Sequence, residues 1–65
     1  MSIRATITVD DDRWAKRAFG VDFDDPECDR QFGAMSLTSR ASAEKRIESA
    51  RAAGFEISEV GERHY

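Results

Sequence analysis

Few residues in this chain have the chemistry of a catalytic site. Nucleophilic catalysis needs a nucleophile, a base within hydrogen-bond reach and a group that orients the base. The only histidine, His64, stands next to Tyr65, and the only cysteine, Cys28, stands between Glu27 and Asp29. Neighbouring carboxylates disfavour the thiolate form of a cysteine. We therefore interpret Cys28 as structural and His64 as solvent-exposed, and we expect no enzyme activity.

Metal and cofactor motifs are also missing from the sequence. One cysteine and one distant histidine do not make a zinc site. An EF-hand loop starting at Asp22 would place Pro26 at position 5 and Glu27 at position 6, where a ligand oxygen and a glycine are required. Glycine-rich phosphate loops do not occur. The sequence predicts no cofactor and no metal.

Carboxylates supply the remaining chemistry. Residues 10–29 hold eight acidic residues against three basic ones, a net charge of −5, whereas residues 30–53 carry +3. A carboxylate array competes with DNA for a basic groove, because both are polyanions. We predict a protein-binding site made of these acids and one aromatic residue: Asp10, Asp11, Asp12, Asp22, Phe23, Asp24, Asp25, Glu27 and Asp29. The alternative is that the acids are solvated surface, that Phe23 belongs to the core and that residues 10–12 form a helix cap or turn.

Length and composition limit the kind of protein that carries these residues. The chain has 65 residues, a mass of 7.3 kDa and a formal net charge of −3. A chain of this size buries about 60% of its unfolded surface, so we expect one domain over 1–65 with one small core. A single cysteine cannot form an internal disulfide, and no run of 18 apolar residues occurs. We expect a cytoplasmic protein that neither crosses nor spans a membrane.

The N-terminal half alternates between apolar and polar residues. Residues 3–9 place isoleucine, alanine and valine on one face and Arg4 with two threonines on the other, which predicts a half-buried strand. Residues 10–12 then cap a short helix that Gly20 ends in a left-handed conformation. A hairpin with 10–12 as the turn and 13–19 as the returning strand is the alternative. Residues 21–24 follow as an edge strand or extended loop.

The C-terminal half predicts two helices and two strands. Asp25 caps a helix over 26–32 that Gly33 closes, because proline suits the first helical position. A strand over 35–38 leads to Thr38 or Ser39, which caps a helix over 40–53. That helix buries a stripe of three small or apolar residues and is followed by a glycine stop and a strand over 55–59, whose apolar residues point inward. The buried stripe is Ala43, Ile47 and Ala50, the stop is Gly54, and the inward residues are Phe55 and Ile57.

Together these elements predict an α+β fold. We expect a small antiparallel sheet of three or four strands, with one main helix packed on it and one or two short helices.

Two resemblances bear on function. Residues 4–12, Arg-Ala-Thr-Ile-Thr-Val-Asp-Asp-Asp, resemble the opening of ribbon-helix-helix DNA-binding proteins, and residues 37–44 resemble that family's capped second helix. In that family the first strand pairs with its twin and reads the major groove. The resemblance implies a DNA-binding regulator or antitoxin in which Arg4, Thr6 and Thr8 contact bases.

Size, acidity, the single α+β domain and the lack of catalytic motifs resemble small phage-encoded anti-CRISPR proteins. The resemblance is to those acting against type I systems, with type I-C the subtype suggested. It implies an inhibitor that binds a subunit of the type I CRISPR effector complex (Cascade), in the host cytoplasm, where that subunit would bind DNA. We expect a monomer or weak dimer that does not itself contact nucleic acid. A third interpretation is an adaptor that docks through basic residues of the long helix: Arg40, Lys45, Arg46 and Arg51.

Overall fold

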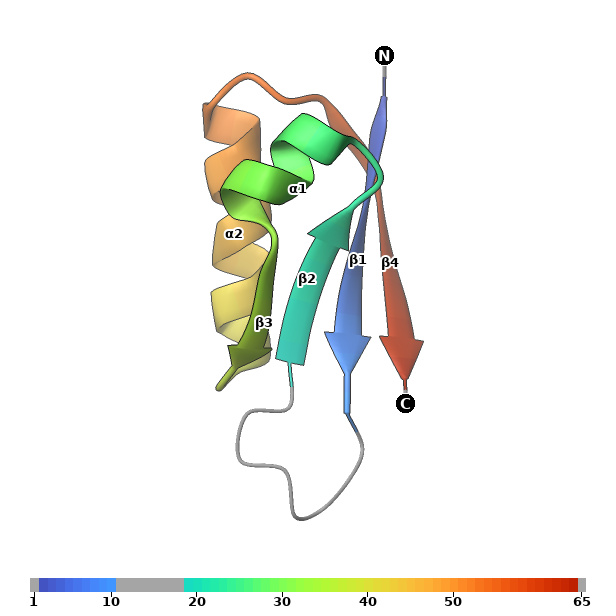
Figure 1. Ribbon diagram of the computed structural model, residues 1–65, viewed down its shortest axis with the longest axis vertical. Helices are drawn as coiled ribbons and strands as arrows, with labels where there is room; N and C mark the ends of the chain where they lie inside the picture. The colour runs from blue at the N-terminus through green and yellow to red at the C-terminus, as the bar shows by residue number, and fades with distance from the viewer. Residues whose placement is uncertain (1, 11–18, 65) are drawn as a thin grey trace.

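Four strands and two helices make up the part of the chain that the structure describes (Figure 1). The computed structural model describes residues 2–10 and 19–64. The elements in chain order are β1 (Ile3–Val9), β2 (Phe19–Phe23), α1 (Pro26–Phe32), β3 (Ala34–Leu37), α2 (Arg40–Ala52) and β4 (Ile57–His64). The predicted α+β class is confirmed, with one long and one short helix.

The four strands form one mixed sheet in the order β3-β2-β1-β4. β2 runs antiparallel to both β1 and β3, as predicted, but β4 runs parallel to β1. The prediction of a wholly antiparallel sheet is therefore wrong for this pair. The cause is α2, which connects β3 to β4 and returns the chain to the end of the sheet where β1 begins, as a parallel pairing requires.

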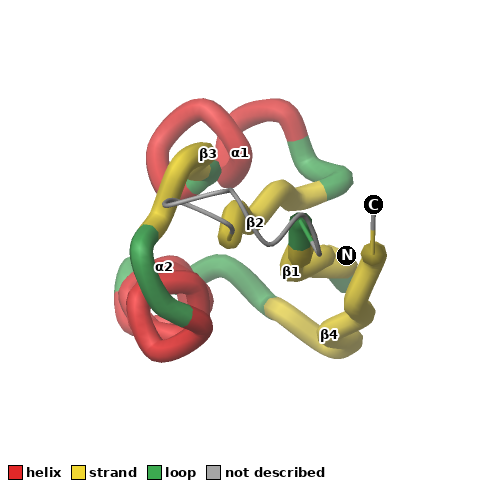
Figure 2. The backbone as a smooth tube through the Cα atoms, turned by 90° about the horizontal axis from the view of Figure 1, so that it is seen from below, coloured by secondary structure: helices red, strands yellow, loops and turns green. Residues whose placement is uncertain are grey.

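The core lies between the sheet and α2, which covers one sheet face and leaves the other open (Figure 2). The predicted stripe of α2, namely Ala43, Ile47 and Ala50, is buried against apolar residues of the strands. Those strand residues, with Cys28 of α1, complete the core: Ile3, Ala5, Ile7, Val21, Phe23 and Ile57. Small side chains on α2 let the helix approach the sheet closely.

β1 has the predicted bounds and the predicted two faces. Ile3, Ala5 and Ile7 are buried under α2, whereas Arg4 lies on the open side. Both long edges of β1 are occupied, because β2 pairs with one and β4 with the other. The first strand of the chain is thus the interior strand of the sheet.

β2 begins where the sequence predicted the end of a short helix. Residues 11–18, which hold most of that helix and of the alternative returning strand, lie outside the described residues. Phe19 and Gly20 belong to β2, and Gly20 pairs with Thr8 rather than ending a helix with positive φ. A Cβ at Gly20 would lie 2.6 Å from Thr8 Oγ1, so the absence of a side chain at this position lets β1 and β2 approach closely. Of the alternative returning strand over 13–19, only Phe19 is described, and the strand that pairs antiparallel with β1 is 19–23.

Both predicted helix caps after Phe23 are present. The Asp25 side chain accepts a hydrogen bond from Cys28 N at 2.9 Å, and Pro26 opens α1, whose bounds match the prediction. Of the two candidate caps for α2, Ser39 is the one used, since its Oγ accepts from Ser42 N at 3.2 Å. Gly54 after α2 has φ 101°, the left-handed conformation expected of a helix stop.

The last two strands are shifted from their predicted bounds. β3 starts one residue early, and Ser36 within it has φ 62°, where the β2–β3 pairing also changes register. β4 runs to His64, well beyond the predicted end at residue 59. Phe55 precedes β4, yet it packs edge-on against Phe32 of α1 with ring centroids 5.9 Å apart. The parallel pairing with β1 accounts for the added length.

Candidate functional site

Five of the predicted site residues lie together on the segment from β2 to α1. Asp22 and Asp24 follow one another along the open face at the end of β2, and three acids follow in the turn and α1. Residues 22–30 contain a single basic residue, Arg30. We call this group the acidic surface; its members are Asp22, Asp24, Asp25, Glu27 and Asp29.

Three carboxylates of the acidic surface accept hydrogen bonds from backbone N–H groups. Asp24 Oδ1 accepts from Arg4 N of β1 at 3.0 Å. Asp25 caps α1, and Asp29 Oδ1 of α1 accepts from Phe23 N of β2 at 3.1 Å. These bonds tie the turn to α1 on one side and to the sheet on the other. The carboxylates are therefore held in place by the fold rather than by mobile side-chain partners.

Glu27 and Asp22 differ from these three. Glu27 accepts from Arg30 Nη2 at 2.6 Å and from Gln31 Nε2 at 2.8 Å, and these hydrogen bonds hold the pKa of the Glu27 carboxyl below its ordinary value. Asp22 is exposed, and no described residue donates a hydrogen bond to its carboxylate. Asp22 is thus the acid of this surface whose removal disturbs the fold least.

The other predicted site residues are not part of the acidic surface. Phe23 is buried in the core at 5% exposure, which corrects its assignment to an interface, because β2 turns its odd-numbered side chains toward α2. Asp10 is exposed but follows β1 at the end of the sheet opposite α1 (Figure 1), so it does not extend the surface. Asp11 and Asp12 lie outside the described residues.

Cys28 is buried beneath the acidic surface. Its side chain is fully enclosed in the core cluster. Burial, together with the nearby charges of Asp25, Asp29 and Asp24, raises the pKa of the thiol. A buried thiol with a raised pKa is a poor nucleophile, so its position favours the predicted structural role.

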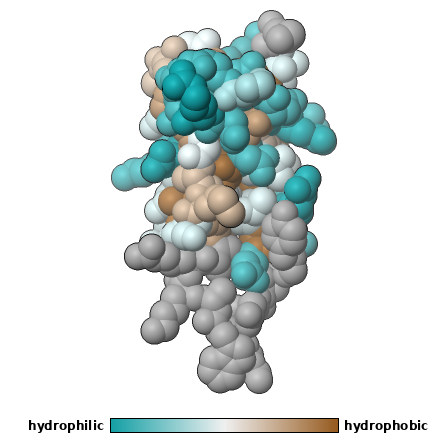
Figure 3. Space-filling view, in the orientation of Figure 1, coloured by the Kyte–Doolittle hydropathy of each residue, from teal (hydrophilic) through white to brown (hydrophobic). Residues whose placement is uncertain are grey.

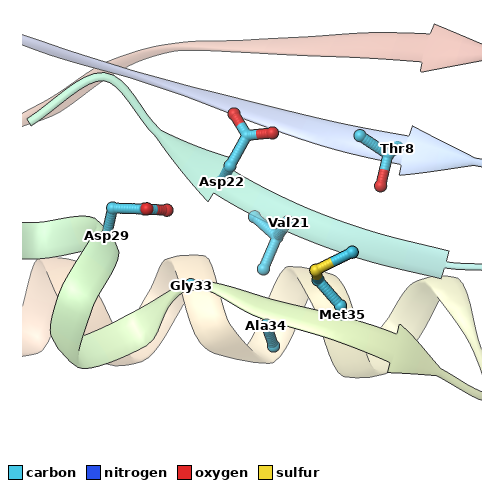
Figure 4. A pocket seen from close by; sticks show the side chains of 7 residues that line it. All are labelled: Thr8, Val21, Asp22, Asp29, Gly33, Ala34 and Met35. Atoms are coloured by element: carbon cyan, nitrogen blue, oxygen red, sulfur yellow. The ribbon is translucent and has the colours of Figure 1, made fainter. Parts of the chain in front are cut away.

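A cavity of about 430 Å³ opens beside the acidic surface, where β3 diverges from β2 (Figure 4). Asp29 reaches toward it from α1, and Asp22 stands on β2 at its border. Met35 of β3, at 88% exposure, provides an apolar wall. The remaining lining residues are Thr8, Val21, Gly33 and Ala34. Sequence reasoning missed this cavity, because it depends on the change of register between β2 and β3, for which the sequence carries no signal.

The open face of the sheet is where a ribbon-helix-helix protein would present its reading residues. In Figure 3 polar atoms gather over the upper part of the view, where α1 lies, and along the flanks, with paler and apolar atoms between them. Because β1 is hydrogen-bonded on both edges, it cannot pair with a twin strand. Arg4 moreover binds Glu59 at 2.9 Å. The described fold therefore lacks the two-stranded ribbon on which that resemblance depends.

Charges on α2 are largely paired with one another. Arg51 Nη1 lies 2.7 Å from Glu48 Oε1, and Arg40 pairs with both Glu44 and Glu62 of β4. Two of the four basic residues of the adaptor interpretation are thus neutralised within the chain. The helix presents a mixed surface rather than a basic one.

The described residues show no group of three or more histidine, cysteine or acidic side chains that is placed to hold a metal ion. Among them no helix combines the length and apolar character needed to span a membrane. In comparisons with known proteins, no family model, no curated protein and no solved structure matches this chain.

Proposed function

We propose that this protein is a stoichiometric inhibitor that binds a DNA-binding subunit of a type I CRISPR effector complex through its acidic surface, acting in the cytoplasm of the host bacterium. The observation that carries the proposal is the gathering of five carboxylates and one basic residue on the β2–α1 segment. No catalytic role is assigned to any residue. The partner is a protein, and the inhibitor itself does not contact nucleic acid.

The charge layout supports competition with DNA. Duplex DNA carries one negative charge per about 1.7 Å of its axis, and proteins that bind it present basic grooves of matching potential. In an extended strand, side chains two residues apart share a face at about 6.6 Å. Asp22 lies on β2 and Asp24 directly follows the strand, with its N–H still donating to Arg4 O of β1, so the two carboxylates lie in one row. The acids of α1 continue the negative potential past the end of the strand. A basic groove would attract this surface over several ångströms before contact.

Preorganisation supports the same proposal. Ordering a side chain at an interface costs about 0.5–1.5 kcal/mol when the side chain is free beforehand. Asp24, Asp25 and Asp29 are already held by backbone amides, so part of that cost is met when the chain folds. Arginine side chains of a partner would meet acceptors that are fixed in position.

The test separates binding from stability. The tagged protein is used to capture purified type I effector subunits, and association rates are measured at low and moderate salt. Asp22→Asn and Glu27→Gln each remove one charge from the acidic surface, whereas Glu48→Gln on α2 removes the same charge elsewhere. We expect the first two to slow association severalfold and the third to leave it unchanged, since interface charges act mainly on association rates.

A DNA gel shift with the same samples completes the experiment. Capture of a subunit that DNA displaces, with loss of capture at higher salt, would support the proposal. Equal effects of Asp22→Asn and Glu48→Gln would show that net charge rather than the acidic surface matters. Binding of DNA without capture of any subunit would overturn the proposal.

A further inference from the structure

The two edges of the sheet differ in their readiness to pair with another strand. β3 has four residues and a positive φ at Ser36, which interrupts its pairing pattern. β4 has eight residues, and β1 is its hydrogen-bonded neighbour on one side within the described chain. Short, kinked edges resist pairing, whereas long regular ones invite it. The edge formed by β4 is therefore the one at which the sheet can grow.

Backbone groups of β4 alternate between β1 and the outer edge. Arg4 bonds through its backbone toward β2, since Asp24 N donates to Arg4 O at 3.1 Å, so Ala5 and Ile7 bond toward β4. Ala5 pairs with Val60 and Ile7 with Glu62. In a parallel pair, a residue bonds to the two residues on either side of its partner in the neighbouring strand. Gly61 lies between Val60 and Glu62, the partners of Ala5 and Ile7, so its N–H and C=O point toward β1. Val60 and Glu62 turn theirs outward.

We propose that β4 pairs antiparallel with β4 of a second copy of this chain, across a two-fold axis at Gly61. The axis stands perpendicular to the sheet and makes one continuous sheet of both copies. Val60 of each copy then lies opposite Glu62 of the other, and the outward backbone groups of these residues exchange hydrogen bonds. The backbone N–H and C=O of Gly61 point toward β1 of its own copy. Because neither Gly61 has a side chain, the two β4 strands can approach each other closely at the axis.

Charge complementarity selects this register. On the open face, Glu59 of each copy, which also binds Arg4 of its own copy, lies opposite Arg63 of the other copy. The same ion pair between Glu59 and Arg63 thus forms on both sides of the axis. A register centred on Glu59, Glu62 or Arg63 would place two identical charges directly opposite each other. A register centred on Val60 would place Glu59 opposite Gly61 and Glu62 opposite Ser58, so that no opposite charges face each other. Opposite charges in facing positions stabilise a strand pair, and like charges destabilise it. Because β4 is charged along its length, one register is favoured and indiscriminate pairing is opposed.

An exposed apolar residue lies at the same edge. Val60 is 46% exposed and borders a groove of about 350 Å³ between β4 and α2, with Ile7 and Ile47 on its apolar side. Arg40 of α2 holds Glu62 beside this groove. In the proposed register the Val60 side chains of the two copies are diagonal neighbours on the helix-covered side of the sheet, so pairing shields both from water.

Sedimentation equilibrium of the full chain over micromolar to millimolar concentrations tests the dimer. Arg63→Glu places glutamates opposite each other at both pairs, and Glu59→Arg places arginines there. Glu59→Arg also removes the ion pair with Arg4 within each copy, so Arg63→Glu is the cleaner variant of the two. We expect each variant alone to form a dimer whose dissociation constant is roughly tenfold higher, or more, than that of the natural chain. An equimolar mixture of the two variants restores both ion pairs, so a heterodimer should form and be visible by native mass spectrometry.

The mixture also controls for folding, because variants that had lost their structure would not pair with each other. Circular dichroism of each variant alone checks that point directly. A natural chain that stays monomeric at millimolar concentration would overturn the proposal. A dimer that Arg63→Glu leaves intact, or a mixture that forms no heterodimer, would also overturn it.

Discussion

The carboxylates of the β2–α1 segment and the charges of α2 belong to the same small fold but bond to different kinds of partner. Asp24, Asp25 and Asp29 accept from backbone N–H groups of other residues. The ion pairs within α2, by contrast, join exposed side chains three or four residues apart. The part-buried amides of Phe23 and Cys28 are left without a partner when their acceptor is removed, whereas an exposed side chain regains water. The acids of the β2–α1 segment therefore stabilise the fold and also form the proposed interface. The acids of α2 contribute little to either.

Asp29→Ala should give the largest loss of stability of the four predictions. Asp29 accepts from the part-buried Phe23 N, and an unsatisfied buried donor costs about 1–3 kcal/mol. Asp29→Asn keeps an oxygen acceptor and the same low helix propensity, so it is the matched control and should lose less. Urea denaturation of the three proteins measures the difference. Equal losses for both variants would mean that the charge, not the hydrogen bond, is what matters.

Asp25→Ala should have the next largest effect. Loss of an N-cap costs typically about 1 kcal/mol, and the amide of Cys28 loses its partner. Asp25→Asn retains the cap but removes the charge, and it should stay close to the natural chain in thermal unfolding followed by circular dichroism. A large loss with asparagine would assign the stabilisation to the charge and would contradict the capping role.

Glu44→Gln and Glu48→Gln should change stability by no more than about 0.5 kcal/mol, because each breaks one exposed ion pair on α2. The same urea denaturation applies. A loss equal to that of Asp29→Ala would remove the contrast between the two regions.

Acid titration should produce the smallest effect. Hydrogen bonds from Arg30 and Gln31 lower the pKa of Glu27, and hydrogen bonds from His64 and Arg40 lower the pKa of Glu62. A carboxyl whose pKa is lower in the folded state stabilises the fold above its ordinary value of 4.5, and that contribution is lost as the pH falls through the lowered pKa. The free energy of unfolding should thus decrease as the pH falls below 4.5. Glu27→Gln combined with Glu62→Gln should flatten that slope, and an unchanged slope would contradict it.

Local signals predicted the helices well, because their determinants are adjacent in sequence. Asp25 and Pro26 define the start of α1, and Ser39 and Gly54 bracket α2. That the five members of the acidic surface lie near one another could be predicted for the same reason, since they fall within eight consecutive positions.

Features that depend on distant partners were not predictable in this way. Alternation over residues 22–24 does not say which side faces the helix, so Phe23 was assigned to the interface although it packs in the core. The start of β2 is fixed by pairing with β1, and the length and direction of β4 by the path of α2. The cavity beside Met35 arises from a register change between strands.

The interior position of β1 has a consequence for the order in which the protein folds. Its two neighbours come from very different distances along the chain, since Arg4 pairs with Glu59 across 55 residues. Contacts of such separation form late, because a long loop must close before they stabilise anything. During folding, β1, β2 and both helices can assemble while one edge of β1 is still bare. Until β4 docks, that edge exposes unpaired backbone groups with which another strand can pair.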